Sequence, residues 1–238
     1  MIALEFEKIL IEPGIFYWTW RDLDFLPYAW LEERDLKKLP LPFYLYDIHP
    51  DSPIGFPCEG EESKTNEINL PRSFEDLRLT ADLRKDLRRV EKKNSSTRTV
   101  PNEENALEKA GKWFLELWEE ESADFKRRML LWKDAFTLSA YSEEKLQGVH
   151  ISLPAQNGLH YLGCWWDRSN KNLSIPTFLL KKDVERAISL NLSFYDLGIG
   201  NEPYKKQWGV FERQTKYYAA MQKPLAQQLG LKRFVDIS

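Results

Sequence analysis

The sequence lacks several features that would assign it to a common class of protein. Its 238 residues include two cysteines, Cys58 and Cys164, which are too few for a disulfide framework. No apolar run approaches the roughly 18 residues that a membrane-spanning helix needs. The first residues also lack the basic start and apolar stretch of a secretory signal. We therefore predict a cytoplasmic protein that does not span a membrane.

The chain has no excess of positive charge. Its 34 Lys and Arg residues face 37 Asp and Glu residues, and the formal net charge of -3 disfavours non-specific binding of long nucleic acids. The charges are segregated, however, because residues 71–100 sum to +4 and residues 171–238 sum to +5, whereas the other stretches are acidic. A phosphorylated ligand would therefore bind in a local basic cleft.

Signatures of metal-dependent and nucleotide-binding enzymes are missing as well. The three histidines, His49, His150 and His160, are scattered, and no Cys or His pair has the spacing of zinc ligands. There is no Gly-Lys-Ser phosphate loop. The sequence Gly198-Ile-Gly200 is not followed by the third glycine and helix of a dinucleotide fingerprint. We therefore predict no metal and no Rossmann domain.

Aromatic residues, in contrast, are abundant: they make up 13% of the chain and are dense in residues 1–57. This stretch is also acidic, and we expect it to pack against the rest of the protein as an N-terminal segment. Leu26–Leu39 has a helical pattern, and the polar stretch Cys58–Asn69 predicts a loop or linker. Short apolar runs typical of strands lie at Ile9–Ile11, Ile15–Trp18 and Phe43–Tyr46.

Residues 70–238 form the predicted main domain, in which two sequence periods alternate. Helical spacing of apolar residues occurs at Leu83–Asn94, Ala106–Trp118, Phe125–Phe136 and Ser174–Leu190. Runs typical of strands occur at Phe136–Tyr141, Leu146–Leu153, Gly158–Trp166, Leu192–Leu197 and Phe211–Ala220. Asn157-Gly158 indicates a hairpin, and Pro224–Gly230 a short final helix. Helices, then a meander, then strand, helix and strand predict an α+β, or mixed α/β, fold.

The predicted meander contains candidates for catalysis. His150 and His160 lie on the two sides of the hairpin, so they either form a cross-strand pair or include a general base, for which the reference pKa of about 6.5 is suitable. We take His150 as the candidate base. Cys164 has the character of a small buried residue rather than of a nucleophile.

The predicted helix 83–94 carries two rows of cations. Arg84 and Arg88 lie one turn apart, as do Lys85 and Arg89. The rows are suited to a phosphorylated ligand, but they equally fit a solvated face paired with neighbouring aspartates. Charge alone leaves both interpretations open.

The segment Tyr195–Gly209, which reads YDLGIGNEPYKKQWG, ends a predicted strand and continues through a glycine-containing turn into Tyr204-Lys205-Lys206. It resembles the end of the GNAT-type fold in the FemAB-like and cellulose-biosynthesis-associated acetyltransferase group. There a strand with an aromatic-Asp pair runs through Gly-x-Gly/Asp into Tyr-Lys before a Trp or Phe.

A second segment supports this resemblance. Residues 70–93, LPRSFEDLRLTADLRKDLRRVEKK, are similar to the same group's Leu-Pro, Ser-x-Glu-Asp and Arg-Lys-x-Leu-Arg-Arg helix. Together with the helix Ser174–Leu190, the likeness covers about residues 65–220. A more distant resemblance, to the C-terminal half of arginyl-tRNA-protein transferases, rests on the same order of strand, helix, strand and Tyr-Lys.

The resemblance implies a mostly antiparallel central sheet flanked by helices, and N-acyl transfer as the activity. In this reaction an amine attacks a thioester or ester carbonyl held against a splayed central strand, which would be Gly158–Trp166. Backbone amides near Gly163, Cys164 and Trp165 would bind the donor carbonyl or the oxyanion.

The resemblance also implies roles for side chains. Tyr204 would be the acid that protonates the leaving thiolate, and Asp196 and His150 complete the predicted catalytic set. The start of the helix after the splayed strand would receive phosphates. The remaining predicted donor contacts are Asn172, Ser174, Lys205, Arg84 and Arg88.

One departure from the family pattern concerns the donor. An ordinary coenzyme A user of the GNAT type has an Arg/Gln-x-x-Gly-x-Gly/Ala loop between this strand and helix, whereas Asp167–Ser174 contains no glycine. We expect acetyl-CoA or another acyl-CoA as donor, with aminoacyl-tRNA as the alternative, and a small-molecule or peptide amine as acceptor. A further alternative is a catalytically inert GNAT-like module that binds a partner through its aromatic N-terminal segment.

Overall fold

The chain divides into two compact units. The computed structural model describes residues 6–12, 15–20, 37, 39–48, 50–57, 64–118, 135–155 and 157–238. Unit 1 comprises residues 1–65 and 212–238, and unit 2 comprises residues 66–211. The C-terminal residues, expected in the main domain, thus group with the N-terminal ones, and the expected boundaries at residues 57 and 70 differ from those of the structure.

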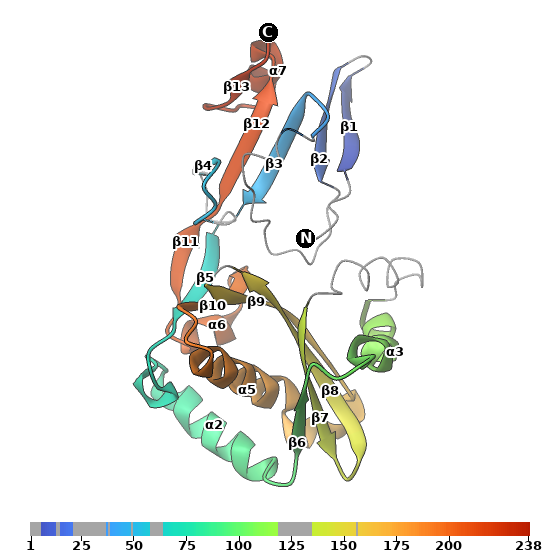
Figure 1. The fold of residues 1–238 in the computed structure, drawn as a ribbon, viewed down its shortest axis with the longest axis vertical. Helices are drawn as coiled ribbons and strands as arrows, with labels where there is room; N and C mark the ends of the chain where they lie inside the picture. The colour runs from blue at the N-terminus through green and yellow to red at the C-terminus, as the bar shows by residue number, and fades with distance from the viewer. Residues whose placement is uncertain are drawn as a thin grey trace. The chain divides into compact units, whose positions relative to one another are not determined.

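Unit 1 is built on a twisted sheet with the order β1-β2-β3-β12-β13, to which β4 adds by pairing with β12 (Figure 1). Its elements are β1 (Phe6–Glu12), β2 (Ile15–Trp20), β3 (Phe43–Ile48), β4 (Phe56–Pro57), β12 (Lys216–Met221), α7 (Lys223–Gln228) and β13 (Val235–Asp236). Phe43, Leu45 and Ile48 of β3 are buried with Ala220 of β12. The strands predicted from the three apolar runs are confirmed. The predicted helix Leu26–Leu39 lies almost wholly outside the described residues.

Unit 2 contains a meander followed by a parallel strand. Its strands are β5 (Lys64–Asn69), β6 (Arg98–Pro101), β7 (Phe136–Ser142), β8 (Lys145–Ala155), β9 (Gly158–Trp166) and β10 (Phe194–Ile199), and with β11 (Phe211–Gln214) they form a sheet of order β11-β5-β10-β9-β8-β7-β6. The pairs from β6 to β9 are antiparallel, whereas β10 runs parallel to β9. The mostly antiparallel sheet is confirmed, and Phe211–Ala220 is divided between β11 and β12 rather than forming one strand.

Strand β5 corrects the predicted loop over Cys58–Asn69. Residues 64–69 form this strand, and Thr65, Asn66 and Glu67 are buried in it. Polar residues are tolerated there because they have partners: Asn66 Nδ2 donates to the carbonyl oxygens of Gly198 at 2.9 Å and Gly200 at 2.8 Å. Polarity was a poor guide to exposure in this stretch. Residues 58–63 lie outside the described part of the chain.

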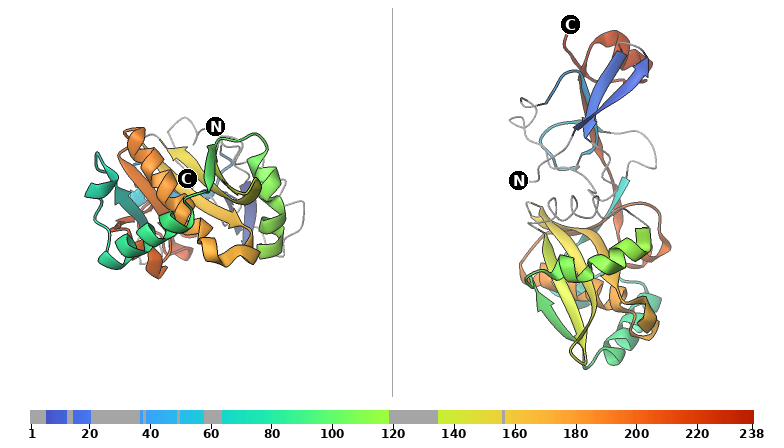
Figure 2. Two further views of the ribbon diagram at one scale, coloured as in Figure 1. Left: turned by 90° about the horizontal axis from the view of Figure 1, so that it is seen from below. Right: turned by 90° about the vertical axis from the view of Figure 1, so that its right-hand side faces the viewer.

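Helices cover both faces of the unit 2 sheet (Figure 1, Figure 2). The helical elements are η1 (Phe74–Asp76), α2 (Ala81–Lys93), α3 (Ala106–Trp118), η2 (Arg168–Leu173), α5 (Ile175–Ser189) and α6 (Pro203–Gln207). Helix α5 packs on β7, β8, β9 and β10, with α2 against it, and α3 packs on β7, β8 and β9 from the other side. The predicted helices at 83–94, 106–118 and 174–190 are confirmed. Phe125–Phe136 is mostly outside the described residues, and Phe136 begins β7.

Local chemistry explains where α2 begins and which face it buries. Thr80 caps its start, because Thr80 Oγ1 accepts a hydrogen bond from Leu83 N at 3.3 Å. Leu83, Leu87 and Val90 recur at helical spacing and are buried in the unit 2 core.

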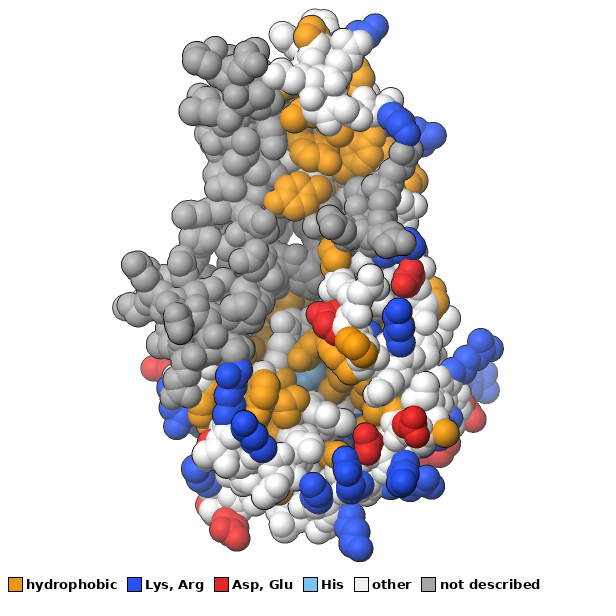
Figure 3. Space-filling view, turned by 180° about the vertical axis from the view of Figure 1, so that it is seen from behind, with side chains coloured by type: hydrophobic (Ala, Val, Ile, Leu, Met, Phe, Trp, Pro, Cys, Tyr) orange, Lys and Arg blue, Asp and Glu red, His pale blue; other side chains and the backbone are white. Residues whose placement is uncertain are grey.

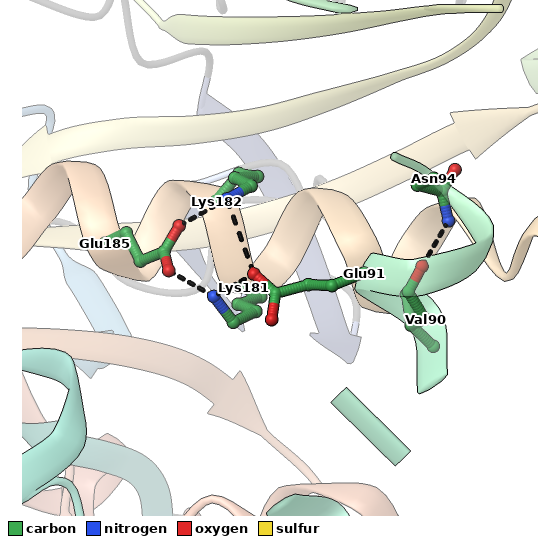
Figure 4. Close-up of polar contacts among 6 residues, drawn as sticks. All are labelled: Val90, Glu91, Asn94, Lys181, Lys182 and Glu185. Atoms are coloured by element: carbon green, nitrogen blue, oxygen red, sulfur yellow. Dashed lines mark hydrogen bonds and ion pairs between the residues drawn. The ribbon is translucent and has the colours of Figure 1, made fainter. Parts of the chain in front are cut away.

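A group of charged side chains joins α2 to α5 (Figure 4). Lys181 is 5% exposed, and its Nζ lies 2.7 Å from Glu91 Oε1 and also bonds Glu185. Lys182 Nζ lies 2.9 Å from Glu185 Oε2. Burial opposes the charge on Lys181, but hydrogen bonds to Glu185 and Glu91 outweigh it and raise the pKa of its ammonium group. These contacts fix the two helices on each other.

Candidate active site where two strands part

The central feature of unit 2 is the separation of β9 from β10. The two strands pair in parallel over three positions, Phe194 with Gly158, Tyr195 with Leu159 and Asp196 with His160. Among the described residues, β9 then continues to Trp166 paired with β8 alone. The register with β8 shifts here, because Ser152 faces Tyr161 but Ile151 faces Gly163, which leaves Leu162 as an extra bulged residue. The strand predicted to be splayed therefore has an open edge and a bulge after His160.

Gly163 follows the bulge. Among the atoms of the described residues, a Cβ atom built on Gly163 would meet one within 4 Å, Trp165 Nε1 at 3.9 Å. Trp165 itself is buried, and so is Cys164, whose thiol pKa is raised far above its usual value by burial. Cys164 is thus a core residue, and the backbone amides near Gly163 remain the groups suited to a carbonyl oxygen.

Tyr204 lies on α6, near Tyr161 of β9. The turn that leads to it contains Gly198 and Gly200, whose positive φ angles of 80° and 116° favour glycine. Tyr204 is 38% exposed, and burial together with the nearby Glu202 carboxylate raises its pKa to about 12. Burial, then Cys164 and Tyr204, raise the pKa of Tyr161 well above its usual value. Both phenols are protonated near neutral pH.

Lys205 points inward instead of toward a ligand. Its side chain is 3% exposed, and Nζ donates to the carbonyl oxygens of Ile199 at 2.7 Å and Gly198 at 3.3 Å and lies 2.8 Å from Glu202 Oε2. All three ammonium protons have acceptors. The predicted phosphate contact is therefore wrong for this conformation: Lys205, with Asn66, holds the turn that carries Tyr204. Sequence reasoning missed Asn66 because it was assigned to a loop.

His150 belongs to a sealed network on the α5 face of the sheet. Its Nε2 lies 2.8 Å from the Tyr195 hydroxyl, which donates to Asp183 Oδ2 at 2.8 Å. Arg186 Nη2 lies 2.5 Å from Asp183 Oδ1. His150, Tyr195 and Asp183 have no exposed surface. Burial alone would raise the pKa of Asp183, but His150, Arg186 and the Tyr195 hydrogen bond lower it to about 2.

The other histidine lies elsewhere, and the predicted cross-strand pair is wrong. His150 faces Cys164 and His160 faces Leu153, because the hairpin closes between Ala155 and Gly158 and the two histidines lie at unequal distances from it. His160 instead lies beside Asp196, the last residue of β10 that pairs with β9. Its Nδ1 is 3.5 Å from Asp196 Oδ2.

Comparison with known proteins now identifies the fold family. Residues 78–206, more than half of the chain, match the family described as an acetyltransferase (GNAT) domain. The chain belongs to the acetyltransferase (GNAT) domain family. No curated protein sequence matches the chain.

Solved structures share this GNAT fold. FemX matches with a TM-score of 0.62 and 11% identity, over 83% of this chain and 76% of its own. A C-terminal domain described as that of a lysylphosphatidylglycerol synthetase from Agrobacterium fabrum matches with a TM-score of 0.59 and 11% identity, over 95% and 87%. L-PGS from Bacillus licheniformis gives 0.54 and 12%, over 92% and 83%.

In the loop that precedes α5 in this GNAT domain, several polar groups form hydrogen bonds with one another. Asp167 Oδ1 accepts from Ser169 N at 3.0 Å, and Asn170 N and Ser174 N donate to carbonyl oxygens within the loop. Lys145 lies 2.8 Å from Asp167 Oδ2. Hydrogen bonds from Lys145 and Ser169 lower the pKa of Asp167 to about 2. The carboxylate of Asp167 and two N–H groups of this loop are thus already engaged within the protein.

The other residues that were predicted to contact the acyl donor make separate contacts in the structure. Arg84 Nη2 donates to Leu77 O at 2.5 Å, so it ties α2 to the preceding segment, whereas Arg88 is exposed on α2. The exposed Asn172 offers its carbonyl to a lysine of α2, and Ser174 makes no side-chain cap on α5. The first N–H groups of α5 are therefore not capped by that side chain.

Asn94 fixes this loop and was not predicted as a site residue. It is 3% exposed and its Nδ2 donates to Leu173 O at 2.7 Å. The same Nδ2 also donates to Val90 O at 2.9 Å (Figure 4). The contact with Leu173 joins residues 79 positions apart. Sequence periodicity carries no signal for such a contact.

Two features are absent from the described ranges. None of the helices described is both long and apolar enough to cross a membrane. In the same residues, no group of three or more His, Cys, Asp and Glu side chains is arranged to hold a metal ion.

Proposed function

We propose that the protein is an N-acyltransferase that moves an aminoacyl group from an ester donor, of the aminoacyl-tRNA type, to a primary amine. The observation that carries the proposal is the open edge of β9 with the Tyr204 phenol beside it. An acyl carbonyl held by the amides near Gly163 would lie within the sheet opening, where an amine can attack it. Tyr204 then gives its proton to the leaving oxygen.

The acidity of Tyr204 favours an ester over a thioester. A thiol has a reference pKa of about 8.5, so a thiolate leaves without needing a proton. An alkoxide is a far stronger base and must be protonated as it leaves. A phenol with a pKa of about 12 is a poor acid toward a thiolate but an effective one toward an alkoxide.

The loop at Asp167 supports the same donor. It offers a carboxylate where an ordinary GNAT enzyme would bind the diphosphate of coenzyme A, so the acyl-CoA donor expected from the sequence becomes the alternative. A lysylphosphatidylglycerol synthetase is named for a product with a lysyl group, and its similarity to this chain supports an aminoacyl group as the one transferred.

The proposal is tested by supplying both donors to the 238-residue chain. A mixture of radiolabelled aminoacyl-tRNAs, or acetyl-CoA, is incubated with glycine, lysine, a peptide with a free N-terminus, or hydroxylamine. We expect label to move from the tRNA ester into a stable amide, with slower or no transfer from acetyl-CoA. Transfer from acetyl-CoA alone would replace the proposed donor, and transfer from neither donor would overturn the proposed function.

Substitution of Tyr204 tests its role in this reaction. Tyr204→Phe should lower kcat by about 10²-fold with an ester donor and leave donor binding unchanged, because general acids contribute roughly 10²–10⁴-fold. Tyr141→Phe is the matched control. Tyr141 lies on β7, a strand that does not border the opening, and its hydroxyl donates to Glu103 Oε1 at 2.7 Å. Equal rates for Tyr204→Phe and the wild type would remove Tyr204 from the acid role.

A further inference from the structure

We propose that the outer face of α2 binds the phosphate backbone of the tRNA that carries the aminoacyl group. The inference rests on the proposed function and deepens it, because it names the surface that holds the body of the donor outside the opening. The outer face is the side of α2 opposite its buried residues, and the cations that define it are Lys85, Arg88, Arg89 and Lys92.

The charges of α2 are separated by face. An α-helix has about 3.6 residues per turn, so positions three, four and seven apart lie on one side. Lys85, Arg88 and Lys92 have this spacing, are exposed, and lie opposite the buried apolar residues of the helix. Asp82 and Asp86 fall toward one flank. The outer face of α2 therefore carries cations and no acidic residue, in a chain whose net charge is -3.

The acidic residues of α2 leave most of this positive charge uncompensated. Arg89 Nη2 lies 3.1 Å from Asp86 Oδ1. Glu91 lies toward α5, where its Oε1 is 2.7 Å from Lys181 Nζ (Figure 4). The other three cations of the outer face form no ion pair with any residue that the structure describes. Solvated cations of this kind can neutralise phosphates and release their counterions, which drives binding to nucleic acids.

The remaining cations of α2 have contacts within the protein. Arg84 Nη2 donates to Leu77 O, and Lys93 Nζ donates to Asn172 O at 3.0 Å. These two side chains hold α2 to neighbouring segments, whereas the cations of the outer face have no such structural role. In the view of Figure 3, which shows the side opposite to that of Figure 1, Lys and Arg side chains gather at the lower end.

The outer face leads toward the opening between β9 and β10. Lys93, at the end of α2, contacts η2, which follows β9 in the chain. Two exposed cations of η2, Arg168 and Lys171, extend the basic surface, and Arg168 Cζ lies 5.3 Å from the centroid of the Trp166 ring at the end of β9. Gly163 precedes Trp166 by three positions, about 10 Å along a strand. A tRNA held on α2 can thus extend its 3′ end past η2 to the opening.

The stem of a tRNA fits this face better than a membrane surface does. The 13 residues of α2 span about 20 Å, enough to follow several phosphates of one RNA strand. Proteins bind RNA duplexes mainly through phosphates and 2′-hydroxyls, which Lys and Arg side chains recognise without reading bases. Helices that bind membranes insert an apolar face, whereas the apolar face of α2 is buried in the core of unit 2.

Binding of deacylated tRNA tests the inference without any transfer reaction. Filter binding of radiolabelled tRNA is measured at several salt concentrations for the wild type and for the triple variant Lys85→Gln/Arg88→Gln/Lys92→Gln. We expect the triple variant to bind at least about 10-fold more weakly near 0.1 M salt. The slope of log K against log salt concentration should become shallower by about 2–3, because each phosphate contact contributes about 0.9.

A second triple variant controls for net charge. It removes three exposed cations from other elements and is Arg98→Gln/Lys112→Gln/Lys223→Gln. This control should change the affinity for tRNA by less than about 3-fold and keep the salt slope of the wild type. Both triple variants should have the melting temperature of the wild type to within a few degrees, since the substituted side chains are exposed.

A single substitution on the flank of α2 should act in the opposite direction. Asp86→Asn removes the partner of Arg89 and adds positive potential beside the outer face. It should tighten tRNA binding by about 2–5-fold at low salt and less at high salt, because salt screens exposed charges. Unchanged or weaker binding by Asp86→Asn would contradict the inference, whether or not the triple variant folds.

The other outcomes separate this inference from its alternatives. No binding of tRNA by the wild type, or equal losses in the two triple variants, would overturn it. Flotation with phosphatidylglycerol vesicles tests the membrane: loss of vesicle binding in the α2 variant with tRNA binding intact would assign the outer face to lipid instead. Binding of tRNA through α2 without transfer from aminoacyl-tRNA would overturn the proposed function alone. Transfer from aminoacyl-tRNA with tRNA binding insensitive to the α2 variant would overturn the inference alone.

Discussion

Two clusters of histidine and aspartate lie on opposite faces of the same sheet, and they differ in almost everything except composition. On the α5 face, His150 and Asp183 are sealed together with Tyr195 and Arg186, and the histidine has no exposed surface. On the other face, His160 and Asp196 lie at the point where β9 and β10 part. The first is part of the core, and the second adjoins an opening.

The difference shows how location decides what a His–Asp contact does. In a closed core, a buried charge is stable when its partners surround it, and removing one partner leaves the others unpaired. The α5-face cluster should therefore contribute more to stability than the pair at the opening does.

The largest effect is expected from removing the central charge of the sealed cluster. Asp183→Asn leaves the Arg186 guanidinium, 17% exposed, without its counter-charge, and should lower the free energy of unfolding by about 3–5 kcal/mol. Urea denaturation followed by tryptophan fluorescence measures the change. Asp196→Asn is the comparison, and a larger loss of stability in that variant than in Asp183→Asn would reverse the roles given to the two clusters.

Acid should weaken the sealed cluster in a defined range of pH. The pKa of Asp183 is about 2 in the folded protein, below the value near 3.9 of an unfolded chain, so the unfolded state takes up the proton first. The stabilisation is complete above about pH 4 and is lost as the pH falls toward 2, by about 2–3 kcal/mol in all.

The contribution of Asp183 to this loss of stability is measured by comparing the wild type with Asp183→Asn. Unfolding free energies of the wild type and Asp183→Asn, measured between pH 5 and pH 2, should converge as the pH falls. Parallel curves would show that the carboxylate of Asp183 is not ionised in the folded protein, and the sealed cluster would then need another explanation.

A smaller effect is expected from disturbing the packing of the Phe194 ring beside His160. A Cβ atom on Gly158 would lie 2.4 Å from the Phe194 ring, whose centroid is 5.7 Å from that of His160. Gly158→Ala should thus cost about 1–3 kcal/mol of stability and lower activity by displacing the ring. Gly163→Ala, where the nearest atom of a described residue is 3.9 Å away, is the matched control and should change the unfolding free energy by less than about 1 kcal/mol. Equal stabilities of the two variants would count against a tightly packed α3 face.

Much of the unit 2 fold follows from the sequence because it depends on local periodicity. Leu83, Leu87 and Val90 mark α2, and the alternating runs with Asn157-Gly158 mark the hairpin of β8 and β9. The aromatic-Asp strand and Tyr204 turn were found through their resemblance to a family. In each case the signal lies within a few neighbouring residues.

The rest depends on contacts that no local pattern contains. The polar sequence of β5 is buried because Asn66 meets a turn more than 130 positions later, and Lys205 points inward because carbonyl oxygens of that turn accept its protons. The register of the hairpin places His160 rather than His150 beside Asp196, and neither apolar run contains a signal for that register. Register and side-chain direction are set by the whole sheet.

The smallest effect is expected at Asp167, which sharpens the contrast between the clusters. Its pKa is about 2, like that of Asp183, yet its partner Lys145 is 65% exposed and remains hydrated when the carboxylate is removed. Asp167→Asn keeps an oxygen that can accept from Ser169 N and should cost less than about 1 kcal/mol in urea denaturation. A loss near that of Asp183→Asn would mean that a depressed pKa alone predicts stability. A small loss would show that the decisive quantity is the charge left buried on the partner.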